Sequence, residues 1–343
     1  MALRLALSRL ELPLKHAFTI ARGTETVAQT LIFRLQADGW EGLEGLGESA
    51  PSARYAENVD TIVEHFAAEP LRGDSPFRLE ALLAGRSPAA ACGLDVALHD
   101  LVGKIVGRPL WELLGLDPAL APLTSFTIGI ASLEETLEKV REVAAHPILK
   151  IKLGAGAEIE TVEAIRSIYS GALRIDANEG WTPDEGVRLL RELARFDVEF
   201  CEQPIPAGSP AALRSIRERS PIPIVVDEDS RTAADLAALI GCVDGVNVKL
   251  VKCGGIRAAL AMIHTARALG MKVMLGCMVE SAILATAAAH LSPLVDWADI
   301  DGPFLTAADP FRGVTYDAGK LRLPSAPGLG VAEIGVAREH AAR

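Results

Sequence analysis

Five ionisable residues recur at nearly equal spacing along the second half of the sequence. Each ends or closely follows a short apolar run with the composition of a buried strand. The five are Lys152, Asp176, Glu202, Asp227 and Lys252. A single acidic residue after a strand is most often a turn or a helix cap, but five in phase are harder to explain in this way. If the strands are parallel, their carboxyl ends meet at one edge, and these side chains surround one site.

The residue types in this set indicate metal-assisted proton transfer. Three carboxylates without a neighbouring histidine or cysteine are hard oxygen ligands, which suit Mg²⁺ better than zinc or copper. Without a cation they would repel one another and raise their own pKa values. A lysine on each side of the metal could remove and return a proton next to a substrate carboxylate, because Mg²⁺ stabilises the enediolate that forms. Return of the proton to the opposite face inverts that carbon.

A further lysine lies in the first of these apolar runs. In Lys150-Ile151-Lys152 the two lysines are two positions apart, so on a strand they point to the same side. Lysine is rarely buried without a partner, and the simplest explanation is an edge strand with a solvated face. The acidic residues in phase with Lys152 favour an active-site wall instead. There Lys150 would lower the pKa of Lys152 and contact the substrate carboxylate.

The elements that would position these residues alternate between strands and helices from about residue 124 onward. Residues 132–135 and 182–185 fit helix capping boxes, the second with proline at the first helical position. Repeated strand–helix units imply parallel strands, and eight strands in about 180 residues predict an α/β barrel. An open doubly wound sheet is the alternative, although the glycine-rich nucleotide-binding motifs are missing. The predicted strands are 124–130, 148–153, 173–176, 198–202, 222–226, 245–250, 272–275 and 297–300.

The first part of the chain has a different pattern. Alternating residues predict strands over 2–12 and 26–36, joined by a loop at 13–25, and Asp38-Gly39 predicts a turn into a third strand that ends near residue 48. Helical patterns follow at 57–68, 76–84 and 88–106. Near the other end of the chain, 311–316 and 320–323 predict a hairpin, and we expect this last segment to pack back on the first unit.

Composition excludes several classes of partner. The formal net charge is −11 and no long basic run exists, which argues against nucleic acid and anionic membrane surfaces as partners. The five cysteines are scattered and lack the spacing of metal sites, so we expect reduced thiols in a cytoplasmic protein. No uncharged apolar run reaches the length of a membrane span.

The motifs around the spaced residues resemble those of the muconate-lactonizing-enzyme subgroup of the enolase superfamily. The resemblance covers nearly the whole chain. The matching motifs are Lys150-Ile151-Lys152, Asp176-Ala177-Asn178-Glu179, Glu202-Gln203-Pro204, Asp227-Glu228 and the segment 247–255 that contains Lys252. The resemblance implies an α/β fold, a modified TIM barrel of the (β/α)7β type at 121–304. It also implies an α+β capping domain at 1–120, on which 305–343 packs.

The same resemblance implies a role for each residue. Lys152 and Lys252 would be the acid and base on opposite faces of the substrate. Lys150 would contact the substrate carboxylate. Mg²⁺ would be the cofactor, with Asp176, Glu202 and Asp227 as its ligands. A mandelate-racemase type of site would use a histidine base near the seventh strand, and 272–278 contains none.

Within this subgroup the substrate is implied by residues that match those of dipeptide epimerases. An Asp-x-Asp on the eighth strand binds the dipeptide ammonium group there, and this chain has Asp299 and Asp301. Thr127 matches a substrate-contacting threonine. Arg22 lies where L-Ala-D/L-Glu epimerases bind the glutamate side chain, a task suited to bidentate arginine.

We therefore expect an isomerase that inverts the C-terminal residue of a dipeptide, of the L-Ala-L/D-Glu type, and that forms a homo-oligomer. Another reaction of the subgroup is the first alternative: o-succinylbenzoate synthesis, N-acylamino acid racemisation or cycloisomerisation. A non-catalytic barrel that binds a metal and a carboxylate ligand is the second. The sequence departs from the family at Asp229, where serine is common, and at His99, where tryptophan is common.

Overall fold

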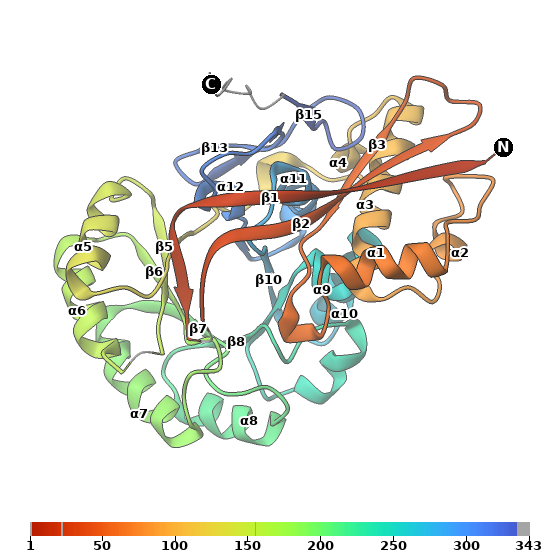
Figure 1. Cartoon of the computed structure of the whole chain (residues 1–343). Helices are drawn as coiled ribbons and strands as arrows, with labels where there is room; N and C mark the ends of the chain where they lie inside the picture. Colours follow the sequence, from red (N-terminus) through yellow and green to blue (C-terminus); the bar gives the residue numbers. More distant parts are fainter. Residues whose placement is uncertain (1, 22, 155, 335–343) are drawn as a thin grey trace.

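Eight parallel strands in chain order form the central sheet of the computed structural model (Figure 1). The structure describes residues 2–21, 23–154 and 156–334. A parallel bridge between Thr124 and Ala298 joins the first strand to the last, so the sheet closes into a barrel. The predicted barrel is confirmed, and the open sheet is excluded. The strands are β4 (Phe126–Ile128), β5 (Ile148–Lys152), β6 (Ala172–Asp176), β7 (Val198–Glu202), β8 (Ile224–Val226), β9 (Gly245–Val248), β10 (Lys272–Gly276) and β11 (Trp297–Asp299).

Helices surround the barrel, and both predicted capping boxes are present. Ser132 and Thr182 each accept a hydrogen bond from the backbone N–H three residues later, while the glutamate at that position reaches back to the N-cap N–H. A 3-10 helix, η4 (Ala233–Leu239), follows β8 in place of an α-helix. The α-helices are α5 (Leu133–Glu142), α6 (Glu158–Ile168), α7 (Pro183–Leu193), α8 (Pro210–Arg219), α9 (Leu250–Cys253), α10 (Ile256–Ala268), α11 (Ala282–Leu291) and α12 (Gly302–Leu305).

Beneath the charged mouth, the barrel interior holds a mainly apolar layer that also includes the buried guanidinium of Arg174, 5.3 Å from the Phe200 ring. Phe200, Val225, Met274 and Trp297 form a separate buried cluster inside the sheet, with the rings of Phe200 and Trp297 4.8 Å apart. Each lies two residues before a position at the mouth, so its side chain points the same way but one layer lower. The strand register then places the side chains of the mouth next to one another, with Lys152 beside Asp176 on the neighbouring strand.

A three-stranded antiparallel sheet and several helices form the cap. The strands are β1 (Leu3–Ile20), β2 (Gly23–Ala37) and β3 (Gly45–Ser49), and the helices are α1 (Val59–Ala68), α2 (Leu79–Leu83), α3 (Pro88–Val106) and α4 (Leu110–Leu113). Strand β3 lies close against α3, because a side chain on Gly47 would come within 2.6 Å of the Ala97 backbone nitrogen.

The loop predicted at 13–25 is wrong, because β1 and β2 continue as a long two-stranded ribbon that crosses over the barrel (Figure 1). The ladder shifts register between Pro13 and Phe18 and then resumes, with Phe18 opposite Glu25 and Ile20 opposite Gly23. Proline lacks an N–H for the ladder, so it is tolerated at this irregularity without ending the strand. The break in pattern at Pro13 therefore marks a bulge.

The last described segment contacts both the cap and the barrel. Leu329 donates its backbone N–H to Asp100 in α3 at 2.8 Å, and His290 in α11 bonds the Leu329 carbonyl at 3.0 Å. The predicted hairpin is only partly correct. Its strands are β13 (Thr315–Asp317) and β14 (Lys320–Arg322), whereas β12 (Phe311–Arg312) pairs with β15 (Ala332–Glu333). Among the described residues, no helix is long and apolar enough to cross a membrane.

Candidate active site

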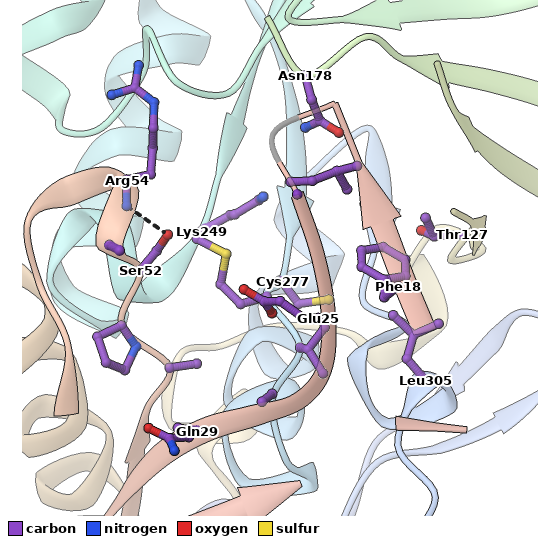
Figure 2. A pocket seen from close by; sticks show the side chains of 18 of the residues that line it. Phe18, Glu25, Gln29, Ser52, Arg54, Thr127, Asn178, Lys249, Cys277 and Leu305 are labelled. Carbon is purple, nitrogen blue, oxygen red and sulfur yellow. Dashed lines mark hydrogen bonds between the residues drawn. The ribbon is translucent and has the colours of Figure 1, made fainter. Parts of the chain in front are cut away.

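A cavity of about 670 Å³ lies between the cap and the mouth of the barrel. Its barrel wall includes Lys152 and Lys249, and its cap wall includes Phe18, Glu25 and Arg54. Figure 2 shows the ribbon that carries Phe18 and Glu25 on one side of this space and the segment with Ser52 and Arg54 on another. A cavity of this volume is large enough to hold a small organic ligand.

On the β5 side of the mouth, the two lysines lie at different depths. The Lys150 ammonium is buried between three carboxylates, 2.5 Å from Glu202, 2.7 Å from Asp299 and 3.2 Å from Asp176. Lys152 bonds Asp176 at 2.6 Å, with no second carboxylate partner among the described residues, and keeps 9% of its side chain exposed at the cavity. Both side chains point into the barrel, as their spacing predicted.

The buried charges on this side shift each other's pKa values. Burial alone would lower the pKa of Lys150, but Asp299, Glu202 and Asp176 outweigh it and raise that pKa well above its usual value. Burial likewise opposes ionisation of Asp176, yet Lys152 and Lys150 hold its pKa far below the usual range. The pKa of Glu202 is raised by burial and by the charge of Asp176.

On the β9 side, a lysine that the sequence reasoning missed reaches the cavity. Lys249 follows β9 directly, lines the cavity and bonds Asp227 at 2.9 Å, with 10% of its side chain exposed. Burial opposes its charge, but Asp227 and Glu202 raise its pKa. The signal was present in the sequence, because Asn247 and Lys249 alternate in phase with the interior face of a strand.

The structure does not place Lys252 in the cavity. The strand ends at Val248, and Lys252 lies in the short helix α9, where its side chain has no exposed surface. Its ammonium bonds the Asp227 carboxylate and donates to the backbone carbonyls of Asp227 at 2.7 Å and Asn247 at 3.0 Å. A group enclosed in this way holds the turn after β8 against the end of β9.

The three carboxylates predicted as metal ligands lie on neighbouring strands, at the ends of β6 and β7 and directly after β8. Asp176, Glu202 and Asp227 are all buried. Among the described residues, no three acidic, histidine or cysteine side chains surround one point closely enough to hold a metal. Here Lys150 occupies the space between Asp176 and Glu202. The donor set still fits Mg²⁺, because it offers oxygen only and already stabilises a cation.

At the end of β11, two carboxylates have different partners. Asp299 accepts hydrogen bonds from Ser125 and Lys150, and although burial opposes its charge, Lys150 lowers its pKa. Asp301 accepts a hydrogen bond from the Thr127 backbone N–H at 2.6 Å, yet burial and the charge of Asp299 raise its pKa to about 6. Asp299, Asp301 and Thr127, the residues expected to contact the substrate, all line the cavity.

One face of the cap ribbon forms the opposite wall. Pairing of Phe18 with Glu25 and of Ile20 with Gly23 puts alternate residues on one side, and Phe18, Ile20, Glu25, Val27 and Gln29 all line the cavity. Arg22, predicted to bind an acidic side chain, lies outside the described residues.

Beside the ribbon, a second part of the cap contacts the barrel. Arg54, which also lines the cavity, bonds Glu179 after β6 through two nitrogens, at 3.0 and 2.8 Å. This bidentate pair joins the segment around η1 (Ala53–Tyr55) to the barrel mouth.

The two departures from the family pattern have structural partners away from the cavity. Asp229 accepts hydrogen bonds from the Gly208 N–H at 2.8 Å and from Gln203 at 2.7 Å, so its charge fixes the loop after β7. His99 lies within α3 and bonds the Asp95 carbonyl at 2.8 Å. Neither side chain lines the cavity.

Fold and site together define a capped (β/α) barrel with a ring of lysines and carboxylates at its mouth. Residues 132–333 match the family described as enolase C-terminal domain-like, and residues 6–115 match the mandelate racemase / muconate lactonizing enzyme N-terminal domain. The chain belongs to this family of the enolase superfamily. The matched ranges leave the predicted boundaries at residues 120 and 304 as predictions.

Several relatives cover almost the whole chain. An L-Ala-D/L-Glu epimerase of Bacteroides thetaiotaomicron is 37% identical over 94% of this chain and 86% of that protein. A hydrophobic dipeptide epimerase of Roseobacter litoralis is also 37% identical, over 91% and 93%. The structure resembles a dipeptide epimerase of Enterococcus faecalis in complex with Mg and L-Leu-L-Tyr, with a TM-score of 0.91 and 33% identity over 97% of this chain and 100% of that one.

Proposed function

We propose that this chain is a dipeptide epimerase that inverts the α-carbon of the C-terminal residue by proton transfer between two lysines. The observation that carries the proposal is the placement of Lys152 and Lys249. They stand on β5 and after β9, four strands apart in an eight-stranded ring, and both ammonium groups reach the same cavity. Two proton carriers on opposite sides of one cavity are what inversion of a carbon centre requires. Lys249 thus takes the role that the sequence had given to Lys252.

The remaining charges of the mouth would hold the substrate carboxylate. Lys150 lies between the metal-ligand positions and Asp299, so its ammonium is placed to contact a carboxylate bound there. Asp176, Glu202 and Asp227 would hold Mg²⁺, which, when bound, supplies positive charge that stabilises the enediolate form of the substrate. Lys152 and Lys249 then exchange the α-proton from opposite faces, one as base and the other as acid.

The β11 carboxylates support a dipeptide as the substrate. Asp299 and Asp301 present acceptors to the cavity, and a free ammonium group is the part of a dipeptide that two carboxylates recognise. Substrates of o-succinylbenzoate synthases and cycloisomerases lack this group. Thr127 would contact the substrate beside Asp301. The relatives act on acidic and on hydrophobic dipeptides, and we propose the L-Ala-L/D-Glu type, with the role of Arg22 in it still a prediction.

Deuterium incorporation tests the proposal directly. Purified protein is incubated in ²H₂O with Mg²⁺ and a library of dipeptides, and mass spectrometry measures label at the C-terminal residue. We expect label and epimer in at least one dipeptide, with loss of both after chelation of the metal. If no dipeptide gains deuterium, the epimerase assignment fails; label in an N-acylated amino acid alone would instead favour racemisation of such compounds.

We further propose a cytoplasmic location and a homo-oligomeric state. All five cysteines are free thiols, which supports a reducing compartment. Leu113, Leu120 and Leu123 expose apolar side chains on the segment that joins cap and barrel, where contact with a second copy would bury them. Light scattering of the purified protein tests the oligomeric state, and a monomer at micromolar concentration would contradict it.

A further inference from the structure

A carboxylate of the cap binds the start of a barrel helix. Glu48 lies on β3 and has no exposed surface. One of its oxygens accepts the Ser281 backbone N–H at 2.9 Å, and the other accepts the Ser281 hydroxyl at 2.6 Å and the Leu284 N–H at 3.1 Å. These donors include free N–H groups of the first turn of α11, and an anion is favourable at this end of a helix. The contact joins two units far apart in sequence.

The loop that precedes this helix forms part of the cavity wall. It runs from the end of β10 to Ser281, and Cys277, Met278 and Val279 line the cavity. The Cys277 sulfur lies 3.6 Å from the Asp301 carboxylate. A side chain on Gly302, the residue after Asp301, would come within 2.7 Å of the Met278 carbonyl, so the loop packs directly on the backbone beside Asp301.

We propose that Glu48 is a positioning residue for the dipeptide site, which fixes the 277–281 loop behind Asp301 and aligns the cap with it. This inference rests on the proposed function, because it takes Asp301 as a contact of the substrate ammonium. Lys152 stands on β5, and Lys249, although it follows the strand next to β10, bonds Asp227 on its other side, after β8. Displacement of the loop therefore weakens substrate binding more than it slows proton transfer.

The three donors around Glu48 make Glu48→Gln a sharp test. A carboxylate accepts on both oxygens, whereas an amide must direct its NH₂ group at either the Ser281 N–H or the Leu284 N–H. In either orientation the amide NH₂ faces a backbone N–H, and that N–H loses its acceptor. The variant keeps the size of the side chain, so it alters the contact without leaving a cavity.

Asp309 provides a matched control at the same helix end. It accepts the Ala282 N–H at 2.7 Å from the C-terminal segment and has no part in the cap contact. Asp309→Asn weakens the start of α11 without loosening β3. Ser281→Ala is a milder change on the barrel side of the Glu48 contact, and it remains informative if Glu48→Gln does not fold.

Two measurements test the inference. Hydrogen exchange of segment 277–291 needs no substrate, and we expect Glu48→Gln to speed it. With a dipeptide that wild type epimerises, we expect KM to rise at least about tenfold and kcat to change less than about threefold. Ser281→Ala should raise KM about threefold, and Asp309→Asn should change KM less than about twofold.

Opposite results would overturn the inference. An equal rise in KM for Asp309→Asn would show that helix stability, not cap position, is responsible. Unchanged exchange at 277–291 in Glu48→Gln would remove the positioning role, as would a fall in kcat at constant KM. Failure of the proposed function appears separately, as absence of deuterium incorporation by the wild-type protein.

Discussion

The two lysine pairs reach the mouth of the barrel by different backbone routes. Lys150 and Lys152 are two residues apart on β5, and both side chains enter the barrel interior. Lys249 and Lys252 are three residues apart across the start of α9, where the strand has already ended. In both pairs one ammonium is enclosed by several oxygens; Lys150 and Lys152 both line the cavity, whereas in the second pair Lys249 lines it and Lys252 does not.

Within each pair, burial and the number of acceptors, and not charge, distinguish the lysine that is held in place from the lysine that can exchange a proton. Lys150 and Lys252 have 2% and 0% of their side chains exposed, and each bonds several oxygens. Lys152 and Lys249 have 9% and 10% exposed, and each bonds one carboxylate. A reacting ammonium must leave its partner to meet substrate, and the cost of this is smaller with fewer partners.

Removal of Lys152 or Lys249, the less buried lysine of each pair, is expected to have the largest effect on kcat/KM. Lys152→Ala and Lys249→Ala should each lower kcat/KM roughly 10²–10⁴-fold, because each removes one proton carrier. Exchange with ²H₂O should then be lost from one epimer and retained with the other, in opposite senses for the two variants. If both variants lost exchange equally with both epimers, the assignment of Lys152 and Lys249 to opposite faces of the substrate would be wrong.

Removal of Lys252, the enclosed lysine that follows β9, should lower the stability of the protein. Lys252→Met leaves Asp227 buried beside an apolar side chain and should lower the free energy of unfolding by roughly 3–5 kcal/mol. Chemical denaturation measures this loss, with Lys249→Met, which removes the cavity-side ammonium bonded to the same Asp227, as the matched comparison. If Lys252→Met unfolds normally but abolishes exchange from one epimer, the two residues have been assigned the wrong way round.

The two carboxylates at the end of β11, Asp299 and Asp301, differ in pKa, and this difference predicts how activity depends on pH. Asp299 is held ionised by Lys150, whereas the pKa of Asp301 is raised to about 6. Asp301 must be ionised to bind an ammonium group, so kcat/KM should fall as pH drops through about 6, about tenfold per pH unit below it. Asp301→Asn should lower kcat/KM and flatten this acidic limb. An unchanged limb in the variant would assign it to another group.

The smallest effect is expected at a charge that lies near Asp227 in sequence but outside the mouth. Asp229→Ser restores the residue common in the family and removes two hydrogen-bond partners, Gly208 N–H and Gln203. The free energy of unfolding should fall by about 1 kcal/mol, and kcat/KM should stay within about threefold. A change of more than tenfold in kcat/KM would show that this charge reaches the substrate.

The sequence predicted the barrel well because its signals are local and repeated. Each strand is a short apolar run, and Asp176, Glu202 and Asp227 stand at the strand ends as their spacing indicated. Equal spacing failed at Lys252, because regular intervals do not show where a strand ends and a helical turn begins. The alternation from Asn247 to Lys249 carries that information.

The cap was predicted less accurately for a different reason. Residues 13–25 hold proline, lysine and histidine, which have low strand propensity, but pairing with β2 and contact with the barrel mouth override it. The roles of Glu48 and Arg54 depend on partners more than 100 residues away. Such contacts leave no periodic pattern in the chain.

Because the barrel interior below the mouth is tightly packed, solvent reaches the reacting groups from the cavity side. Phe200, Val225, Met274 and Trp297 offer no partners for a chain of water molecules beneath the mouth, and the buried Arg174 in the same layer already donates to Glu199 and to the Ala298 carbonyl. Any proton that Lys152 or Lys249 exchanges with solvent must therefore cross the cavity under the cap ribbon. Isotope washout during turnover then becomes a measure of how often the ribbon admits water while substrate is bound.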